Sequence, residues 1–171
     1  ETVPPDFGSG GGPTGAQRMI FGYPGRKPCV DSAGNEWLPA TEIVVRTGHN
    51  TDPVTQTWWT NPAEKPIAGT ADPELYRYGV HAPEFWVNLT VGPGVYRVCL
   101  KFAGRRGPAD PARRAMKIAI NGQEVLEQLD VAEKAAGQYR PLDLTFEGIR
   151  PAHGVIEIRL SAPGGEAVLQ G

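Results

Sequence analysis

Two aromatic positions in this sequence are placed where they could bind another molecule. Trp58 and Trp59 lie together in a polar stretch, residues 47–65, that has no helix or strand pattern. Loops longer than about 12 to 15 residues are often functional in compact domains. Tyr78 and His81 follow before the next apolar run. Aromatic rings stack on flat apolar faces, and phenol and imidazole groups form hydrogen bonds. The alternative is that one tryptophan packs inward on the core.

A second candidate group is a pair of arginines at the end of a predicted strand. Arg105 and Arg106 lie between Gly104 and Gly107, where the apolar alternation stops. A guanidinium group pairs with a carboxylate through two parallel hydrogen bonds, so two neighbouring arginines suit a carboxylated ligand. The alternative is an ordinary solvated loop whose charges face water.

The sequence shows little sign of catalysis. It has 19 acidic residues, but no two are marked as the converging acid and nucleophile of a glycosidase. Its three histidines lack the spacing of a zinc site, and no Ser, Cys or His arrangement marks a nucleophile. Asp52, Asp72 and Asp110 in predicted loops could hold a calcium ion, although aspartates more often cap turns. We expect no cofactor and no enzymatic activity.

Length and composition limit the classes of protein that remain. The 171 residues suit one domain, and the 22 glycines and 17 prolines favour many short strands over helices. The net charge of −2, with both signs interspersed, excludes the basic stripe of a nucleic-acid binder. No apolar run approaches the roughly 20 residues that span a membrane. Residues 1–17 are rich in Gly and Pro and are predicted to form a linker, followed by one domain over 18–171. Because the chain begins with Glu1 and no signal-peptide pattern follows, we expect it to be cut from a larger protein.

Alternating apolar residues predict the strands that would position these groups. Residues 85–91 and 96–102 alternate on either side of Gly92-Pro93-Gly94, which predicts an antiparallel hairpin at the centre of a sheet. Further strands are predicted near 19–23, 42–46, 116–120, 125–131, 142–146, 156–160 and 167–169. Short helical segments are predicted at 71–77 and 132–138. The spacing is that of an all-β antiparallel sandwich, whose loops cluster at its two ends.

The sequence does not decide whether the two cysteines form a disulfide. Cys29 and Cys99 could form a disulfide, which would indicate an oxidising compartment, or remain as small hydrophobic residues.

The order of the motifs resembles the malectin and malectin-like carbohydrate-binding modules. The similar segments are Asp31–Trp37, Gly69–Arg77, Phe85, Gly92–Ala103 and Ile120–Leu126. The resemblance implies a jelly-roll β-sandwich that binds sugars without catalysis and that, in bacteria, is often attached to secreted glycoside hydrolases. It therefore implies an extracellular or periplasmic location, a carbohydrate ligand and neighbouring domains of a parent enzyme as partners. Family members usually close with a further strand after the position of Gly171.

Some of the family's binding residues differ here. Cys29 lies in the segment where animal malectin has a cleft aromatic residue, and Arg105 and Arg106 replace a Tyr-Phe pair. Glu166 corresponds to an acidic residue near the final strand. From the residues and the resemblance together we predict that Trp58, Trp59, Tyr78, His81, Arg105, Arg106 and Glu166 form a sugar-binding surface. The alternative is a structural module that packs on its parent enzyme and binds no sugar.

Overall fold

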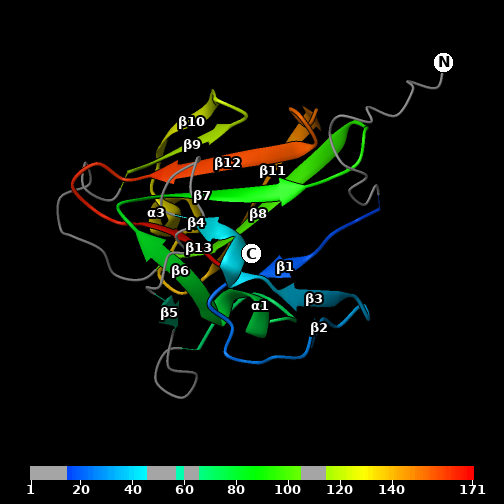
Figure 1. The fold of residues 1–171 in the computed structure, drawn as a ribbon. Coiled ribbons are helices and arrows are strands. Elements are labelled where there is room, and N and C mark those ends of the chain that lie inside the picture. The colour runs from blue at the N-terminus through cyan, green and yellow to red at the C-terminus, as the bar shows by residue number, and fades with distance from the viewer. Residues whose placement is uncertain (1–14, 46–56, 60–65, 105–114) are drawn as a thin grey trace.

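The computed structural model describes residues 15–45, 57–59, 66–104 and 115–171 (Figure 1). Most of the predicted linker, as well as Arg105, Arg106, Asp52 and Asp110, lies outside these residues. In the described part, no helix has the length and apolar character needed to cross a membrane.

The chain forms two facing layers of β-strands. One layer is a five-stranded sheet in the order β10, β9, β12, β7, β4, formed by Gln123–Leu129, Met116–Ile120, Val155–Ser161, Glu84–Thr90 and Val44–Val45. The facing layer contains the ribbon of β8 (Tyr96–Ala103) and β11 (Pro141–Ile149). It continues with β6 (Tyr78–Ala82), which lies between β13 (Ala167–Leu169) and β5 (Thr57–Trp59). The expected all-β sandwich is confirmed.

Within the described ranges, the two layers are accompanied by a small sheet and three short helices. In the small sheet, β3 (Glu36–Pro39) lies between β1 (Met19–Ile20) and β2 (Cys29–Val30). The helices are the 3₁₀ turn η1 (Thr41–Ile43), α1 (Glu74–Arg77) and α3 (Val131–Lys134). The predicted helical segments are therefore present, whereas the strand predicted at 42–46 begins as η1 and becomes β4 only at Val44.

The core lies between the layers, where each strand contributes alternate side chains. From the five-stranded sheet these are chiefly Phe85, Val87, Ile118, Ile120, Ile156, Ile158 and Leu160. From the facing layer they are chiefly Val80, Val98, Leu100, Phe102 and Leu169.

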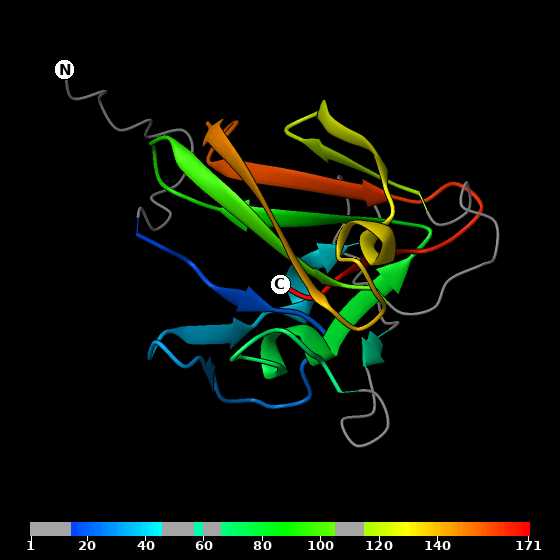
Figure 2. The same ribbon diagram turned by 180° about the vertical axis from the view of Figure 1, so that it is seen from behind.

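The prediction of a hairpin around Gly92-Pro93-Gly94 is wrong. β7 pairs with β12 and β4, while β8 pairs with β11, so the turn carries the chain from one layer to the other. In Figure 2 the ribbon of β8 and β11 crosses over the sheet that contains β7. A hairpin would place both apolar faces on one sheet, whereas crossing between layers lets Phe85 and Phe102 pack within the same core. The Asn121-Gly122 turn does join a hairpin, β9 to β10, and both residues have the positive φ that such a turn requires.

Both cysteines are free thiols. Cys29 is buried and Cys99 is exposed.

The C-terminal segment is held in the middle of the facing layer by a buried side chain. Gln170 is fully buried; its Oε1 accepts a 2.9 Å hydrogen bond from the Ala103 amide, and its Nε2 lies 3.4 Å from the Ala103 carbonyl. The backbone amide of Phe21 also donates to the Gln170 carbonyl at 2.9 Å. This one residue therefore links the last strand to β8 and to the end of β1.

We predict that Gln170→Leu destabilises the fold, because it leaves the Ala103 amide buried without its acceptor. The expected loss is about 1–3 kcal/mol of unfolding free energy, measured by urea denaturation. Gln128→Leu, on the exposed side of β10, is the matched control and should change stability little. Equal effects of the two substitutions would contradict the role of Gln170.

Candidate functional site

The structure brings His81 and Glu166 together, although they are 85 residues apart in the sequence. His81 lies on β6 opposite Val168 of β13, and Glu166 is two residues before Val168. Such diagonal neighbours on adjacent strands lie within reach of each other on one sheet face. The Nδ1 of His81 lies 2.7 Å from Oε2 of Glu166, with 18% of the histidine side chain and 43% of the glutamate side chain exposed. A paired imidazole and carboxylate that both reach solvent can hydrogen-bond to the hydroxyl groups of a ligand.

Tyr78 begins the same strand and packs against a second tyrosine that the sequence analysis did not select. Its ring and that of Tyr23 meet edge to face, with centroids 5.2 Å apart and planes at 78°. Because side chains alternate along a strand, Tyr78 and His81 project to opposite faces of β6. They belong to one strand but do not form one continuous surface.

The approach of Tyr23 to Tyr78 depends on Gly22. Gly22 has φ +66°, and a Cβ at this position would lie 2.2 Å from the carbonyl oxygen of Gly79 on β6. Only glycine therefore permits the loop after β1 to contact β6 so closely. The hydroxyl of Thr41, which accepts a 2.8 Å hydrogen bond from the Gly22 amide, fixes the loop further.

Trp58 and Trp59 lie in a strand and not, as predicted, in a loop without structure. In β5, Trp58 is opposite Gly79 and Trp59 is opposite Tyr78. The backbone of the tryptophan pair is thus hydrogen-bonded into the sheet that carries Tyr78 and His81, while the two side chains lie outside what the structure describes. Arg105 and Arg106 also lie outside it, after β8 ends at Ala103.

A second polar cluster lies on the outer side of β8 and was not recognised from the sequence. The Nζ of Lys101 donates to Oδ2 of Asp143 at 2.8 Å and to the hydroxyl of Tyr76 at 3.0 Å, and Tyr76 donates to Oδ1 of Asp143 at 2.6 Å. The same Nζ lies 5.2 Å from the ring centroid of Trp37 and 5.1 Å from that of Tyr76. The pKa of Tyr76 is raised to about 12, chiefly by burial and to a lesser extent by the hydrogen bond to Asp143. Because its polar groups are bonded to one another, this cluster fixes strands rather than offering groups to a ligand.

The turn from Asp31 to Trp37 is organised by one carboxylate. Asp31 accepts hydrogen bonds from the indole Nε1 of Trp37 at 3.0 Å and from the amide of Asn35 at 2.8 Å. These bonds, that of Trp37 first, lower the pKa of Asp31 from 3.8 to about 2. Asp72, one of the aspartates considered for calcium, instead accepts from the amide and hydroxyl of Ser32 at 2.6 and 2.9 Å. Among the described residues, no group of three or more His, Cys, Asp or Glu could hold a metal ion.

Comparisons with known proteins agree with this architecture. The family model described as "Malectin domain" matches residues 29–169. The ectodomain of ANX1 from Arabidopsis thaliana superposes with a TM-score of 0.72 at 11% identity, covering 91% of this chain and 46% of that one. A chain from the complex of the plant peptide RALF23 with FER and LLG2 gives 0.70 at 15% identity, covering 91% and 47%.

A bacterial enzyme shares the same fold over part of its length. The D341A D367A calcium-binding mutant of Bacteroides uniformis beta-glucuronidase 2 gives a TM-score of 0.63 at 18% identity, covering 88% of this chain and 17% of that one. The chain thus spans less than half of each of these three proteins. Among curated proteins, none matches the sequence.

We predict that Gly22→Ala disrupts the packing of Tyr23 on Tyr78. Gly34 is the matched control: it has φ +84°, and a Cβ added there would have no atom within 4 Å. Alanine at this position is therefore destabilising only through its unfavourable backbone conformation. Gly22→Ala should lower the unfolding free energy by about 1–3 kcal/mol more than Gly34→Ala, since it also overlaps the Gly79 carbonyl. Equal losses in thermal or urea denaturation would show that the close approach is unimportant.

A second prediction concerns acid stability. Since the folded-state pKa of Asp31 is lowered, its contribution to stability is present above its ordinary pKa of 3.8 and is lost as the pH falls toward about 2. Asp31→Asn should therefore be less stable than the wild type at pH 6, and the difference should shrink steadily between pH 4 and pH 2. A difference that stays constant over this range, measured by urea denaturation, would contradict the assignment.

Proposed function

The chain belongs to the malectin family, and we propose that it is a non-catalytic carbohydrate-binding module that holds a larger secreted glycoside hydrolase on its substrate. The malectin domain is a carbohydrate-binding type of fold that is itself non-catalytic. The observation that carries the proposal is the solvent-accessible pair of His81 and Glu166 on the sheet that also holds the backbone of Trp58 and Trp59.

The residue types in this region match the needs of sugar recognition. A pyranose ring has an apolar C–H side that stacks on an aromatic ring, and hydroxyl groups that pair with planar polar side chains. In our proposal the tryptophan pair, Trp58 and Trp59, supplies the stacking face, while His81 and Glu166 bind hydroxyl groups. Tyr78 lies on the other face of β6 and is not part of this surface. Arg105 and Arg106 are residue types that would favour a sugar that carries a carboxylate.

The parent enzyme and the location are inferred from the neighbours. A fold like that of this chain forms part of a bacterial beta-glucuronidase, and a similar fold forms part of the ectodomain of the plant receptor-like kinase ANX1. Both observations support an extracellular or periplasmic module joined to further domains.

One observation favours a second candidate, a structural module that packs on its parent enzyme without binding sugar. Val30 and Leu38 are 60% and 50% exposed on the neighbouring strands β2 and β3. Two large apolar side chains on an outer strand face suit contact with another domain. The cleft aromatic that the resemblance leads us to expect is also replaced by Cys29, which is buried.

A glycan array, followed by affinity electrophoresis on the polysaccharides it selects, tests the proposal. We expect the wild type to bind, the double variant Trp58→Ala/Trp59→Ala to lose binding, and Trp58→Phe/Trp59→Phe to keep part of it because a ring remains. Glu166→Gln should weaken binding by about tenfold or more, the usual effect of losing a hydrogen bond to a charged group.

The matched control is Glu127→Gln, because Glu127 is exposed on β10 in the other layer. This variant should bind like the wild type. Failure of the wild type to bind any glycan would reject the proposal in favour of the structural module. Binding that survives both the tryptophan and the Glu166 substitutions would place the site elsewhere.

A further inference from the structure

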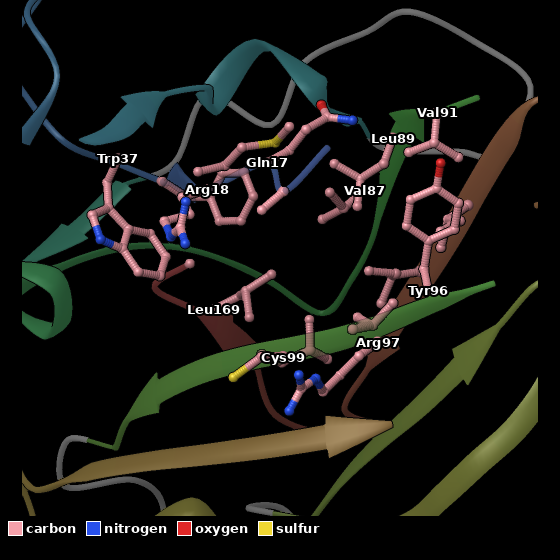
Figure 3. A pocket seen from close by; sticks show the side chains of 18 of the residues that line it. Gln17, Arg18, Trp37, Val87, Leu89, Val91, Tyr96, Arg97, Cys99 and Leu169 are labelled. Atoms are coloured by element: carbon pink, nitrogen blue, oxygen red, sulfur yellow. The ribbon is translucent and has the colours of Figure 1, made fainter. Parts of the chain in front are cut away.

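The outer face of the five-stranded sheet carries a polar hollow with a volume of about 400 Å³. It differs from the cavity between the two layers in Figure 3, whose lining is chiefly apolar and includes Val87, Leu89 and Leu169. The hollow lies over four strands that are side by side, β10, β9, β12 and β7 (Figure 1). We call it the outer-sheet hollow. Its lining includes Glu84, Lys117, Ala119, Glu124, Arg159 and Ser161.

The strand register places these side chains on one face of the sheet. Along β9, buried residues alternate with Lys117 and Ala119, which therefore point away from the core. Residues directly opposite each other on neighbouring strands share a face. Ala119 is opposite Glu124 of β10 on one side and Arg159 of β12 on the other, and Lys117 is opposite Ser161.

The hollow exists because the residues at its floor are small. Ala119 lies between Glu124 and Arg159, and neighbouring strands are about 4.8 Å apart, so roughly 10 Å separates the backbones of those two residues. The side chains of Ala119 and Ser161 are too short to fill this space. The floor therefore leaves room for one small ring between longer polar side chains.

Arg159 is held in place from two sides. Its Nε donates to Oε1 of Glu84 at 2.7 Å, and its Nη2 donates to the same oxygen. Its guanidinium carbon lies 5.3 Å from the ring centroid of Trp86, the residue directly opposite it on β7. A salt bridge and a cation–π contact together fix the orientation of the guanidinium group.

The pair of Arg159 and Glu84 keeps hydrogen-bonding capacity for a ligand. A guanidinium group has five N–H donors, and the two bonds to Glu84 use only two of them. Among the described residues, no hydrogen bond occupies Oε2 of Glu84. The two side chains are 50% and 38% exposed, so the remaining donors and the second carboxylate oxygen are accessible.

Lys117 and Glu124 add one charge of each sign on the other side of the hollow. They are diagonal neighbours on β9 and β10, because Glu124 is opposite Ala119. Both are exposed, and within the described part of the chain neither forms a hydrogen bond or an ion pair. The described lining thus has two carboxylates and two cations, with no excess of either sign.

This composition suits an uncharged ligand that carries several hydroxyl groups. A hydroxyl group donates and accepts at the same time, so neighbouring hydroxyl groups can bridge a carboxylate and an ammonium or guanidinium group. An anionic ligand would meet two carboxylates, and a cationic ligand would meet two cations, so a net charge of either sign is disfavoured.

We propose that the outer-sheet hollow binds one uncharged pyranose unit of a saccharide. Glu84 and Glu124 accept hydrogen bonds from its hydroxyl groups, and Lys117 and Arg159 donate to them. Trp86 acts through Arg159, whose guanidinium group it supports, and does not line the hollow.

This hollow is separate from the surface around His81 and Glu166. Those two residues belong to the facing layer, on β6 and just before β13, whereas the hollow lies on the outside of the five-stranded sheet. Binding of a sugar unit here does not require that surface. Where that surface also binds sugar, as proposed above, two sites on one module hold a polysaccharide more tightly than either alone.

The test uses the isotope-labelled 171-residue protein, with backbone amide resonances as the readout. The probes are methyl β-D-glucopyranoside, methyl β-D-galactopyranoside and methyl α-D-mannopyranoside, which differ in the orientation of their hydroxyl groups. With at least one probe we expect saturable shifts at Lys117, Ala119, Glu124 and Arg159, with the millimolar affinity typical of a single sugar unit. Tetrahydropyran, the same ring without hydroxyl groups, should cause none.

Substitutions in the hollow test the roles of the charged groups. Glu124→Gln and Lys117→Ala should each weaken binding by about tenfold, the usual effect of losing a hydrogen bond to a charged group. The matched controls are Glu127→Gln, on the same strand as Glu124, and Lys27→Ala, in the loop before β2. Glu127 and Lys27 are both exposed and do not line the hollow, so these variants should bind like the wild type.

Three results would overturn the proposal. The first is no saturable shift at these amides with any of the three glycosides, and the second is an equal response to tetrahydropyran. The third is tighter binding of glycine than of every glycoside at the same amides, since this would assign the hollow to zwitterionic ligands.

One further variant separates this proposal from that for the other surface. Glu166→Gln should leave the shifts at Lys117 and Arg159 unchanged, even where it abolishes shifts at His81. Loss of the shifts at Lys117 and Arg159 in this variant would show that they report binding at the other surface, and would also reject the second site.

Discussion

The structure depends on the burial of one apolar face from every long strand in a single core. Phe85 and Leu160 from one layer and Phe102 and Leu169 from the other are almost completely excluded from water. Burial of such side chains is the main favourable contribution to folding, roughly 1.5–3 kcal/mol for each large apolar group. These apolar faces must lie opposite one another to be buried. For this reason β7 and β8, although adjacent in the sequence, lie in different layers.

The candidate sites follow from what this core leaves exposed. β6 buries Val80 and Ala82, so the intervening residue His81 faces outward, where the chain before β13 brings Glu166 to it. On the outer side of β8, Lys101 and Asp143 hold the ribbon to α1 through Tyr76.

The sequence predicted the strands better than their partners, for a physical reason. Alternation with a period of two identifies strands such as β8, β9 and β12, and the positive φ of Asn121 and Gly122 suits the hairpin predicted there. Alternation around Gly92-Pro93-Gly94 is the same for a hairpin as for a crossing between layers, so local pattern could not decide between them. His81 and Glu166 were each selected, but their contact depends on the β6–β13 register. The contact of Lys101 with Asp143 was missed, because it depends on the pairing of β8 with β11.

We propose that the face of the β5, β6 and β13 sheet that carries His81 and Glu166 binds sugar. The most direct measurement is a titration of the isotope-labelled protein with an oligosaccharide, followed through its backbone amide resonances. We expect shifts of the backbone amides of His81, Glu166, Val168 and the tryptophan pair of β5 that grow to saturation. Shifts confined to Val30 and Leu38 on the small sheet, or no shifts with any oligosaccharide tested, would contradict it.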